Sequence, residues 1–336
     1  MPLAPALASA APPVLLAPMA GLSDLPFRRL VARHGAALVV SEMVASHDVL
    51  NVRPDARART ALGLDAADTA VQLAGCDPGA MARAARLVEA AGARQIDINM
   101  GCPAKRVTAA GGTGAAGSAL MRDPDHALRL IEAVIGAAEV PVTLKTRLGW
   151  DDHSRNAPDI ARRAEAAGVA LITVHGRTRC QFYKGRADWD AIAPVVASVG
   201  IPVIANGDIA TPADARRALA RSGARGVMLG RAVPGRPWLL AQIAADLAGQ
   251  PEPAPPRGTA LADLVAEHYQ DMLAFHGRDI GLRAARKHLG AYMDHAGTGA
   301  GLRRRVLTAA APAEVLRLLP EALADTQGAA RLDAVA

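Results

Sequence analysis

Short apolar runs alternate with longer helical patterns along most of this chain, and this alternation restricts the fold more than any other feature. Eight runs predict strands, at 14–17, 37–41, 69–73, 94–98, 141–145, 170–174, 201–205 and 226–229. Helical patterns accompany them near 24–34, 78–92, 123–138, 157–168, 188–197, 211–222 and 234–247. A (β/α)8 TIM barrel has eight strands that alternate with helices, whereas a doubly wound sheet requires no particular number of strands. We therefore expect an α/β TIM barrel.

The alternation stops near residue 248, which predicts a change of domain. Residues 249–258 read GQPEPAPPRG, a stiff Pro-rich linker. Helical patterns without a convincing strand follow in 259–336. The expected organisation is a catalytic barrel over 1–248, the linker, and a small all-helical domain over 259–336.

Composition excludes some classes of protein and leaves one question open. Hydrophobic residues make up 51% of the 336 residues, which excludes global disorder, and aromatic residues only 3%, which disfavours an RNA binder built on stacked aromatic side chains. The net charge is +6, and Lys105, Lys145, Lys184 and Lys287 are the four lysines among 38 basic residues. The arginine excess fits either a GC-rich genome or an anionic partner.

The cysteines and the first residues predict a reducing compartment. Cys76, Cys102 and Cys180 are widely spaced and form no CxxC pair, so we expect neither a disulfide framework nor a metal site. Residues 1–23 carry no charged side chain but contain five prolines, which disfavours a signal peptide. No long apolar run free of Pro and Gly predicts a membrane span, and the cytoplasm is the expected location.

Polar residues follow the predicted strands, where a TIM barrel holds its active site. Cys102 lies in Asn99-Met-Gly-Cys-Pro, directly after the fourth strand, and is a candidate acid or nucleophile, although a small buried hydrophobe is the usual alternative. Lys145 and His175 end the fifth and sixth strands. They fit ligand contacts, against a surface lysine and a core histidine as alternatives. Gln72 could pair with an amide-like ring edge.

The last two strands predict a phosphate site. Asn206-Gly207-Asp208 follows the seventh strand, and Gly230-Arg231 follows the eighth and precedes a helical pattern. Glycine lets a backbone approach an anion closely, and Arg231 adds a charged fork. Ordinary turn chemistry is the alternative.

Basic residues in the tail indicate an anionic partner. The stretch from Arg278 to Arg305 contains seven basic residues and only two acidic ones. Among them, Arg283, Arg286 and Lys287 have the spacing of one helical face. Such a stripe fits contacts with a phosphate backbone, although many charged stripes are simply solvated. Lys105 and Arg106, close after Cys102, have the same two interpretations.

Several motifs now identify a family. The chain resembles the tRNA-dihydrouridine synthases, and GLRAARKHLGAYM at 281–293 resembles their bacterial B-type branch in particular. The other matching stretches, in family order, are APMAGLSDLPFR at 17–28, SEM at 41–43, VQLAG at 71–75, DINMGCPAKRV at 97–107, AGSALMRDP at 116–124, LKTRLGW at 144–150, VHGRTR at 174–179, PVIANGDI at 202–209 and LGRAVPGRPW at 229–238.

This resemblance implies an FMN-binding barrel with a helical tRNA-binding domain. NADPH would reduce the flavin, and the flavin would pass a hydride to C6 of a flipped-out uracil in the D-loop of tRNA, near its elbow, while Cys102 protonates C5. Position 17 is the implied target. The implied cofactor contacts are Pro18, Met19, Ala20, Gln72, Lys145, His175, Asn206, Gly207, Asp208, Gly230 and Arg231. The implied tRNA contacts are Asn99, Lys105, Arg177, Arg283, Arg286 and Lys287.

One departure and two alternatives remain. Thr108 to Ala116 (TAAGGTGAA) is about four residues longer than the family pattern, which affects how the loop after Cys102 rests and closes. An FMN barrel that acts on a free small molecule, as dihydroorotate dehydrogenases do, would have no use for the basic tail. An RNA-binding protein built on an inactive barrel would carry no flavin. A monomer is expected.

Overall fold

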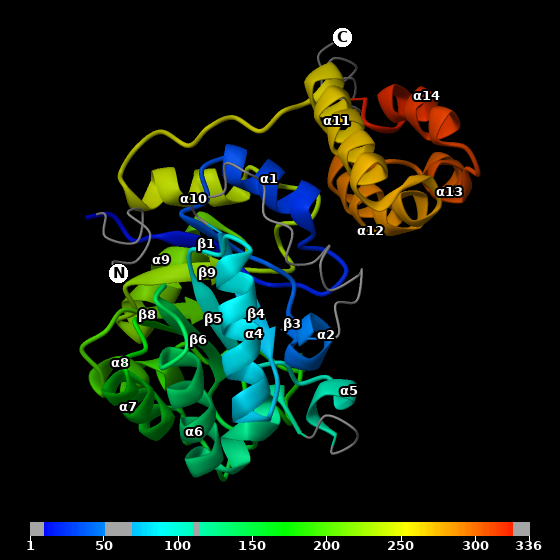
Figure 1. Ribbon diagram of the computed structural model, residues 1–336. Coiled ribbons are helices and arrows are strands. Elements are labelled where there is room, and N and C mark those ends of the chain that lie inside the picture. The colour runs from blue at the N-terminus through cyan, green and yellow to red at the C-terminus, as the bar shows by residue number, and fades with distance from the viewer. Residues whose placement is uncertain (1–9, 51–68, 110–114, 325–336) are drawn as a thin grey trace.

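The computed structural model describes residues 10–50, 69–109 and 115–324 and shows a closed parallel barrel with a helical region beside it (Figure 1). The eight barrel strands are β1 Val14–Leu16, β2 Leu38–Val40, β4 Thr69–Ala74, β5 Ile96–Met100, β6 Val142–Arg147, β7 Leu171–His175, β8 Val203–Asn206 and β9 Gly226–Leu229. Neighbouring strands pair in parallel around the ring, and β1 pairs with β9 to close it. The predicted TIM barrel is confirmed. A short strand that was not predicted, β3 Val44–Ala45, extends the pairing of β4.

Helices between the strands cover the outside of the barrel. They are α1 Leu25–Arg33, α2 Ser46–Leu50, α4 Pro78–Ala90, α5 Lys105–Thr108, α6 Pro124–Ile135, α7 Ala157–Ala167, α8 Ala193–Ala197, α9 Pro212–Ser222 and α10 Leu239–Leu247, with short 3-10 turns η2 Gly117–Arg122 and η3 Asp190–Ile192. The side chains of Asp77, Asp123 and Thr211 cap α4, α6 and α9, each of which has proline in its first turn. This start signal is why the sequence located these helices well.

Several predicted element boundaries were wrong in a way that matters for the site. Asn99 and Asn206 were expected to follow their strands but belong to β5 and β8. Lys145 lies inside β6 rather than at its end, whereas His175 ends β7 as expected. Polar residues near a strand end resemble a loop in the sequence, but here they point into the barrel. The helix expected from 234 begins only at Leu239, so turns follow Arg231 instead of a helix N-terminus.

The interior of the barrel has an apolar end and a polar end. Eight buried side chains form the apolar plug: Leu15, Ala17, Leu38, Val40, Ala70, Leu171, Ile204 and Met228. A larger core lies between the strands and the surrounding helices. Side chains alternate along a strand, so Asp97 and Asn99 face inward while Ile96, Ile98 and Met100 face that outer core. The polar end therefore opens where the strands end.

Four helices follow the linker: α11 Gly258–His276, α12 Arg278–Ala296, α13 Ala300–Thr308 and α14 Pro312–Ala322. They enclose their own hydrophobic core, to which Trp238 from the barrel also belongs. Residues 251–257 of the predicted linker form neither helix nor strand and run in extended form across α10 (Figure 1). No helix within the described residues is long and apolar enough to span a bilayer.

Candidate active site

A cavity of about 610 Å³ opens at the carboxyl ends of the barrel strands. Its volume lies in the usual range for small-molecule and cofactor sites, about 300–1,000 Å³. All eleven residues predicted to contact the cofactor line it, and so do Asn99 and Cys102. Parallel strands bring their carboxyl ends to one rim, so residues scattered over 18–231 converge here.

A chain of buried hydrogen bonds links the barrel interior to the Cys102 loop. Gln72 Nε2 donates to Asp97 Oδ2 at 2.7 Å, and Gln72 Oε1 accepts from Asn99 Nδ2 at 2.7 Å. Asn99 Oδ1 in turn accepts from the backbone N–H of Cys102 at 3.0 Å. Burial raises the pKa of Asp97, against hydrogen bonds from Gln72 and Thr143 that lower it. Asn99 therefore connects the Cys102 backbone to hydrogen-bonded side chains of the barrel strands.

Residues 117–118 hold the same loop from its other side. Ser118 donates from its backbone N–H and its hydroxyl to the Cys102 carbonyl, at 3.1 and 2.9 Å. Gly117 has a φ of 61°, and a Cβ there would lie 2.8 Å from the Cys102 carbonyl oxygen. Only glycine combines that conformation with so close an approach. The loop at 108–116, which the sequence predicts to be longer than the family pattern, is described only in part, because residues 110–114 lie outside the described residues.

Lys145, His175 and Asn206 form a second buried cluster. Asn206 Nδ2 donates to the Met228 carbonyl at 2.7 Å, which turns Asn206 Oδ1 toward Lys145 Nζ at 3.1 Å and His175 Nδ1 at 3.0 Å. Because that oxygen only accepts, His175 carries its proton on Nδ1. Burial, helped by the nearby Arg147, lowers the pKa of Lys145 to about 8. Burial and the cations around it hold the pKa of His175 well below its usual range, so the ring is neutral.

Arg177 and Asp208 form an ion pair beside this cluster. Arg177 Nη1 and Nη2 donate to Asp208 Oδ1 and Oδ2 at 2.9 and 2.5 Å, and the arginine side chain is only 2% exposed. Burial would raise the pKa of Asp208, but the hydrogen bonds from Arg177 and the Ala187 N–H outweigh it and lower that pKa. Arg177 neutralises Asp208, which leaves the exposed Arg231, 3.5 Å from Asp208, to attract an anion.

Comparison with known proteins identifies the family. The dihydrouridine synthase family model matches residues 15–327. The chain belongs to the dihydrouridine synthase family. It is 58% identical to a probable tRNA-dihydrouridine synthase of Rhodobacter capsulatus, over 95% of this chain and 97% of that one. A probable tRNA-dihydrouridine synthase of Rhizobium leguminosarum is 52% identical, over 92% and 95%. The tRNA-dihydrouridine synthase B of Xanthomonas axonopodis is 47% identical, over 85% and 86%. The resemblance inferred from the motifs is confirmed.

Some residues predicted to bind the substrate of this family member do not line the cavity. Arg177 lies behind it, bound to Asp208 and to the carbonyls of Lys184 and Gly185. Lys105 is exposed on α5, whereas its neighbour Arg106 lines the cavity. The other predicted contacts, Arg283, Arg286 and Lys287, lie on α12, away from the cavity lining. Their roles stay predictions.

The cavity also has lining residues that the sequence did not single out, chiefly Arg147, Phe182 and Tyr183. The two aromatic side chains are exposed by 42% and 44% at the mouth, and Phe182 has the unusual positive φ of 55°. Two guanidinium groups lie close to the Tyr183 ring, with Arg147 at 5.5 Å and Arg231 at 4.5 Å from its centroid. Two aromatic residues side by side in a chain with 3% aromatics were the available signal.

Proposed function

We propose that this protein reduces a uridine in the D-loop of tRNA to 5,6-dihydrouridine, using FMN in the barrel and NADPH as the reductant. The observation that carries the proposal is that Cys102 lines the same cavity as the Lys145–His175–Asn206 cluster. A candidate proton donor, Cys102, and a cation that can bind the edge of a planar ring, Lys145, thus line one cavity. Membership of the dihydrouridine synthase family supports the same reaction.

The residues at the mouth of the barrel fit FMN. Gln72 keeps one N–H and one lone pair for a ring edge after its bonds to Asp97 and Asn99, and Lys145 keeps two N–H groups. A Cβ on Gly207 would lie 2.8 Å from Ala187 and 3.2 Å from His175, so glycine is required there, whereas nothing lies closer than 3.6 Å to a Cβ on Gly230 and its backbone stays open to a phosphate. We assign the ring to Gln72 and Lys145, and the phosphate to Gly207, Gly230 and Arg231. When bound there, the reduced flavin supplies a hydride for C6 of the uracil.

Cys102 supplies the proton for C5 in this proposal. Two contacts fix its backbone, from Asn99 on one side and Ser118 on the other, which positions the thiol while it stays within reach of the cavity. Lys145, protonated at neutral pH, stabilises negative charge as the ring is reduced. Asn99 acts by positioning Cys102.

The target uracil must leave its stack to enter the cavity. We propose that it passes the aromatic pair at the mouth and stacks on the exposed Tyr183, close to Arg147 and Arg231. Stacking on an exposed aromatic ring is worth about 1–3 kcal/mol per base. In this view Arg177 holds Asp208 and the 184–185 turn in place rather than touching the uracil.

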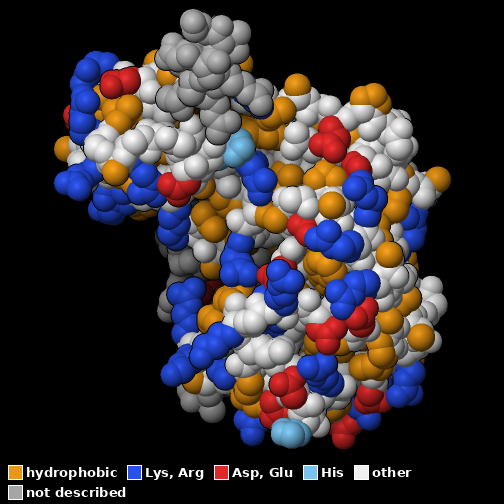
Figure 2. All heavy atoms as spheres, turned by 180° about the vertical axis from the view of Figure 1, so that it is seen from behind, with side chains coloured by type: hydrophobic (Ala, Val, Ile, Leu, Met, Phe, Trp, Pro, Cys, Tyr) orange, Lys and Arg blue, Asp and Glu red, His pale blue; other side chains and the backbone are white. Residues whose placement is uncertain are grey.

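The helical region, residues 259–336 beyond the 249–258 linker, is the proposed tRNA-binding domain of a cytoplasmic monomer. Arg283, Arg286 and Lys287 form one exposed face of α12, and Lys287 Nζ donates to the Gly21 carbonyl at 3.4 Å. Gly21 belongs to the loop whose residues 18–20 line the cavity. Lys and Arg side chains continue along this edge from the helical region onto the barrel (Figure 2). A phosphate backbone could therefore follow the basic face to the mouth.

The test is to incubate the purified full chain with FMN, NADPH and an unmodified tRNA transcript, and to map dihydrouridine by mass spectrometry. We expect one dihydrouridine, at position 17, and none in a transcript with cytidine there. Dihydrouridine at another position would overturn the site assignment alone. No dihydrouridine, together with rapid oxidation of NADPH by orotate or free uridine, would favour the small-molecule barrel. A purified protein without flavin would favour the inactive barrel.

A further inference from the structure

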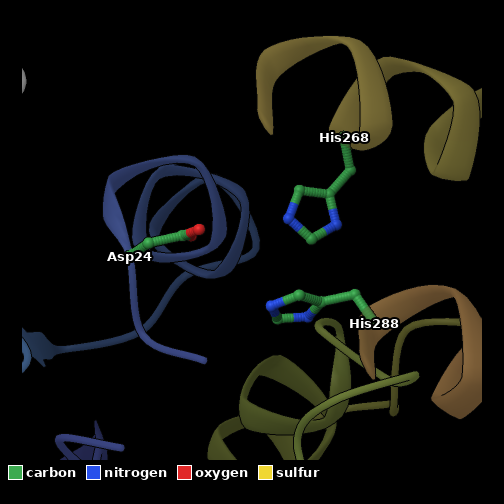
Figure 3. Close-up of side chains that lie close together, drawn as sticks. All are labelled: Asp24, His268 and His288. Carbon is green, nitrogen blue, oxygen red and sulfur yellow. The ribbon is translucent and has the colours of Figure 1, made fainter. Parts of the chain in front are cut away.

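Three potential ligands meet where the barrel joins the helical region. Asp24 lies at the start of α1, His268 on α11 and His288 on α12. One nitrogen from each ring and one Asp24 oxygen all lie within 4.8 Å of one another. Figure 3 shows the two rings near each other at a steep angle, with the Asp24 carboxylate directed toward them. More than 240 residues separate Asp24 from the nearer histidine in the sequence, so no short motif announces the group.

The histidines carry polar atoms that their protein surroundings leave unused. His288 is 1% exposed; the Leu22 backbone contacts its ring, but neither ring nitrogen has a hydrogen bond of normal geometry within the described part of the chain. His268 is 2% exposed and bonds through Nδ1 to the Tyr292 hydroxyl at 3.2 Å, which leaves Nε2 unpartnered among the described residues. An unsatisfied buried polar group costs about 1–3 kcal/mol. One nitrogen of each ring is therefore left for a shared partner.

A metal ion would accept one lone pair from each imidazole. A neutral imidazole carries one N–H and one lone pair, and His268 uses Nδ1 toward Tyr292, so its Nε2 can offer the lone pair. Neutral imidazole and carboxylate are the donors that suit zinc and related divalent transition metals.

We propose that Asp24, His268 and His288 bind one divalent transition-metal ion, with zinc the best match, that fastens the helical region to the barrel. The fourth position stays open to water. No C5 or C6 chemistry is assigned to this ion, because none of the three ligands lines the active-site cavity. Its role is to fix how the basic face of α12 stands relative to the barrel mouth.

The surroundings suit such a site. Asp24 Oδ2 accepts from His276 Nε2 at 2.7 Å and Oδ1 from the Phe27 N–H at 3.1 Å, which orients the carboxylate and leaves it lone pairs to share. Tyr292 orients His268 in the way that outer hydrogen bonds orient metal-bound histidines. Phe27 packs on both rings, 5.8 and 4.7 Å from their centroids, and shields them from water. His276 is 21% exposed and offers a way in.

The group must contract to hold zinc. Zinc–ligand bonds are about 2.1 Å long and point to the corners of a tetrahedron, so two ligand atoms on one ion lie about 3.4 Å apart. The separations of up to 4.8 Å are larger than this by more than an ångström. Rotations of all three side chains toward a common centre would close that difference. The competing account is that the rings are packing partners, since their centroids are 4.9 Å apart and edge-on.

The test is a titration of the EDTA-dialysed full chain with Co²⁺ and then Zn²⁺. We expect one equivalent of Co²⁺ to give visible d–d absorption, Zn²⁺ to displace it, and the melting temperature to rise with bound metal. His268→Gln, His288→Gln and Asp24→Asn should each weaken binding at least 100-fold. Asp24→Asn keeps a good helix cap, so this variant can still be read if a histidine variant fails to fold.

The control is His153→Gln, which removes an exposed histidine outside the group and should leave binding unchanged. Absence of a stoichiometric Co²⁺ spectrum in the wild-type chain would overturn the proposal. So would equal binding by wild type and Asp24→Asn, because adventitious surface histidines would then account for the metal.

Discussion

The barrel mouth and the basic face of α12 are both expected to meet tRNA, yet they are built in opposite ways. At the mouth, charged and polar side chains are buried and bonded to one another across strands, as Lys145 and His175 are through Asn206. On α12, Arg283 and Arg286 are exposed, and Lys287 makes one long contact to Gly21. The barrel mouth thus holds its polar side chains in place through hydrogen bonds, whereas the α12 face presents exposed cationic side chains.

This difference determines how each region responds to substitution. In a connected buried network, the loss of one member displaces or unpairs the others, so effects are large and not additive. Exposed cations act on a polyanion almost independently, and salt screens each of them. Single changes should therefore be severe at the mouth and graded on α12.

Cys102→Ala should give the largest effect. The rate of tRNA reduction is expected to fall at least about 100-fold, the usual contribution of a positioned proton donor. FMN content and NADPH oxidation without tRNA should be unchanged, because the backbone contacts of residue 102 remain. Single-turnover oxidation of the reduced enzyme by tRNA measures this step. Cys180→Ala removes an exposed thiol and serves as the control, and equal rates in both variants would contradict the acid role.

Lys145→Met should come second, through FMN affinity. Titration of the apoprotein with FMN is expected to show at least tenfold weaker binding, because the ring loses its cationic contact. Wild-type affinity should fall as pH rises through about 8, where Lys145 of the apoprotein loses its proton, and the variant should lack that step. Lys184→Met, which changes an exposed lysine outside the cavity, is the control. If the fall in FMN affinity near pH 8 also occurred in Lys145→Met, a group other than Lys145 would be responsible for it.

The triple variant Arg283→Ala, Arg286→Ala, Lys287→Ala should show the graded behaviour of the α12 face. KM for tRNA is expected to rise roughly fivefold to tenfold at moderate salt with little change in kcat. The slope of log affinity against log salt should shrink by about 2–3, since each phosphate contact contributes about 0.9. Arg83→Ala, Arg86→Ala, Arg94→Ala removes equal charge from the α4 side of the barrel and should leave the slope unchanged. Equal slopes in the two triple variants would show that net charge alone attracts the tRNA.

The sequence predicted the barrel and its rim well for a physical reason. The carboxyl ends of parallel strands must gather at one edge, so every polar residue near a strand end is placed there without knowledge of packing. This is why Gln72, Lys145, His175 and Asn206 were found, even though each of their four strands continues past its predicted end.

Pairing across the barrel could not be predicted in the same way. The family resemblance implied that Arg177 contacts the uridine, and only the structure shows that its partner Asp208, 31 residues further along, holds it outside the cavity lining. Tyr183 lies in a loop without periodicity, so no pattern marked its position close to Arg147 and Arg231. The Asp24–His268–His288 group depends on the docking of two separate hydrophobic cores, which residue spacing does not encode.

The ion pair Arg33–Glu267 should give the smallest effect, although it also joins the barrel to the helical region. Arg33 Nη1 lies 2.6 Å from Glu267 Oε1, but both side chains are 52% exposed, so water and salt screen the attraction. A double-mutant cycle of Arg33→Ala and Glu267→Ala, followed by urea unfolding, should give a coupling energy of no more than about 1 kcal/mol. Dihydrouridine formation should be unchanged in both single variants. A larger coupling energy would mean that the junction is drier than its exposure indicates, and that exposed contacts also help to hold the basic face in register with the mouth.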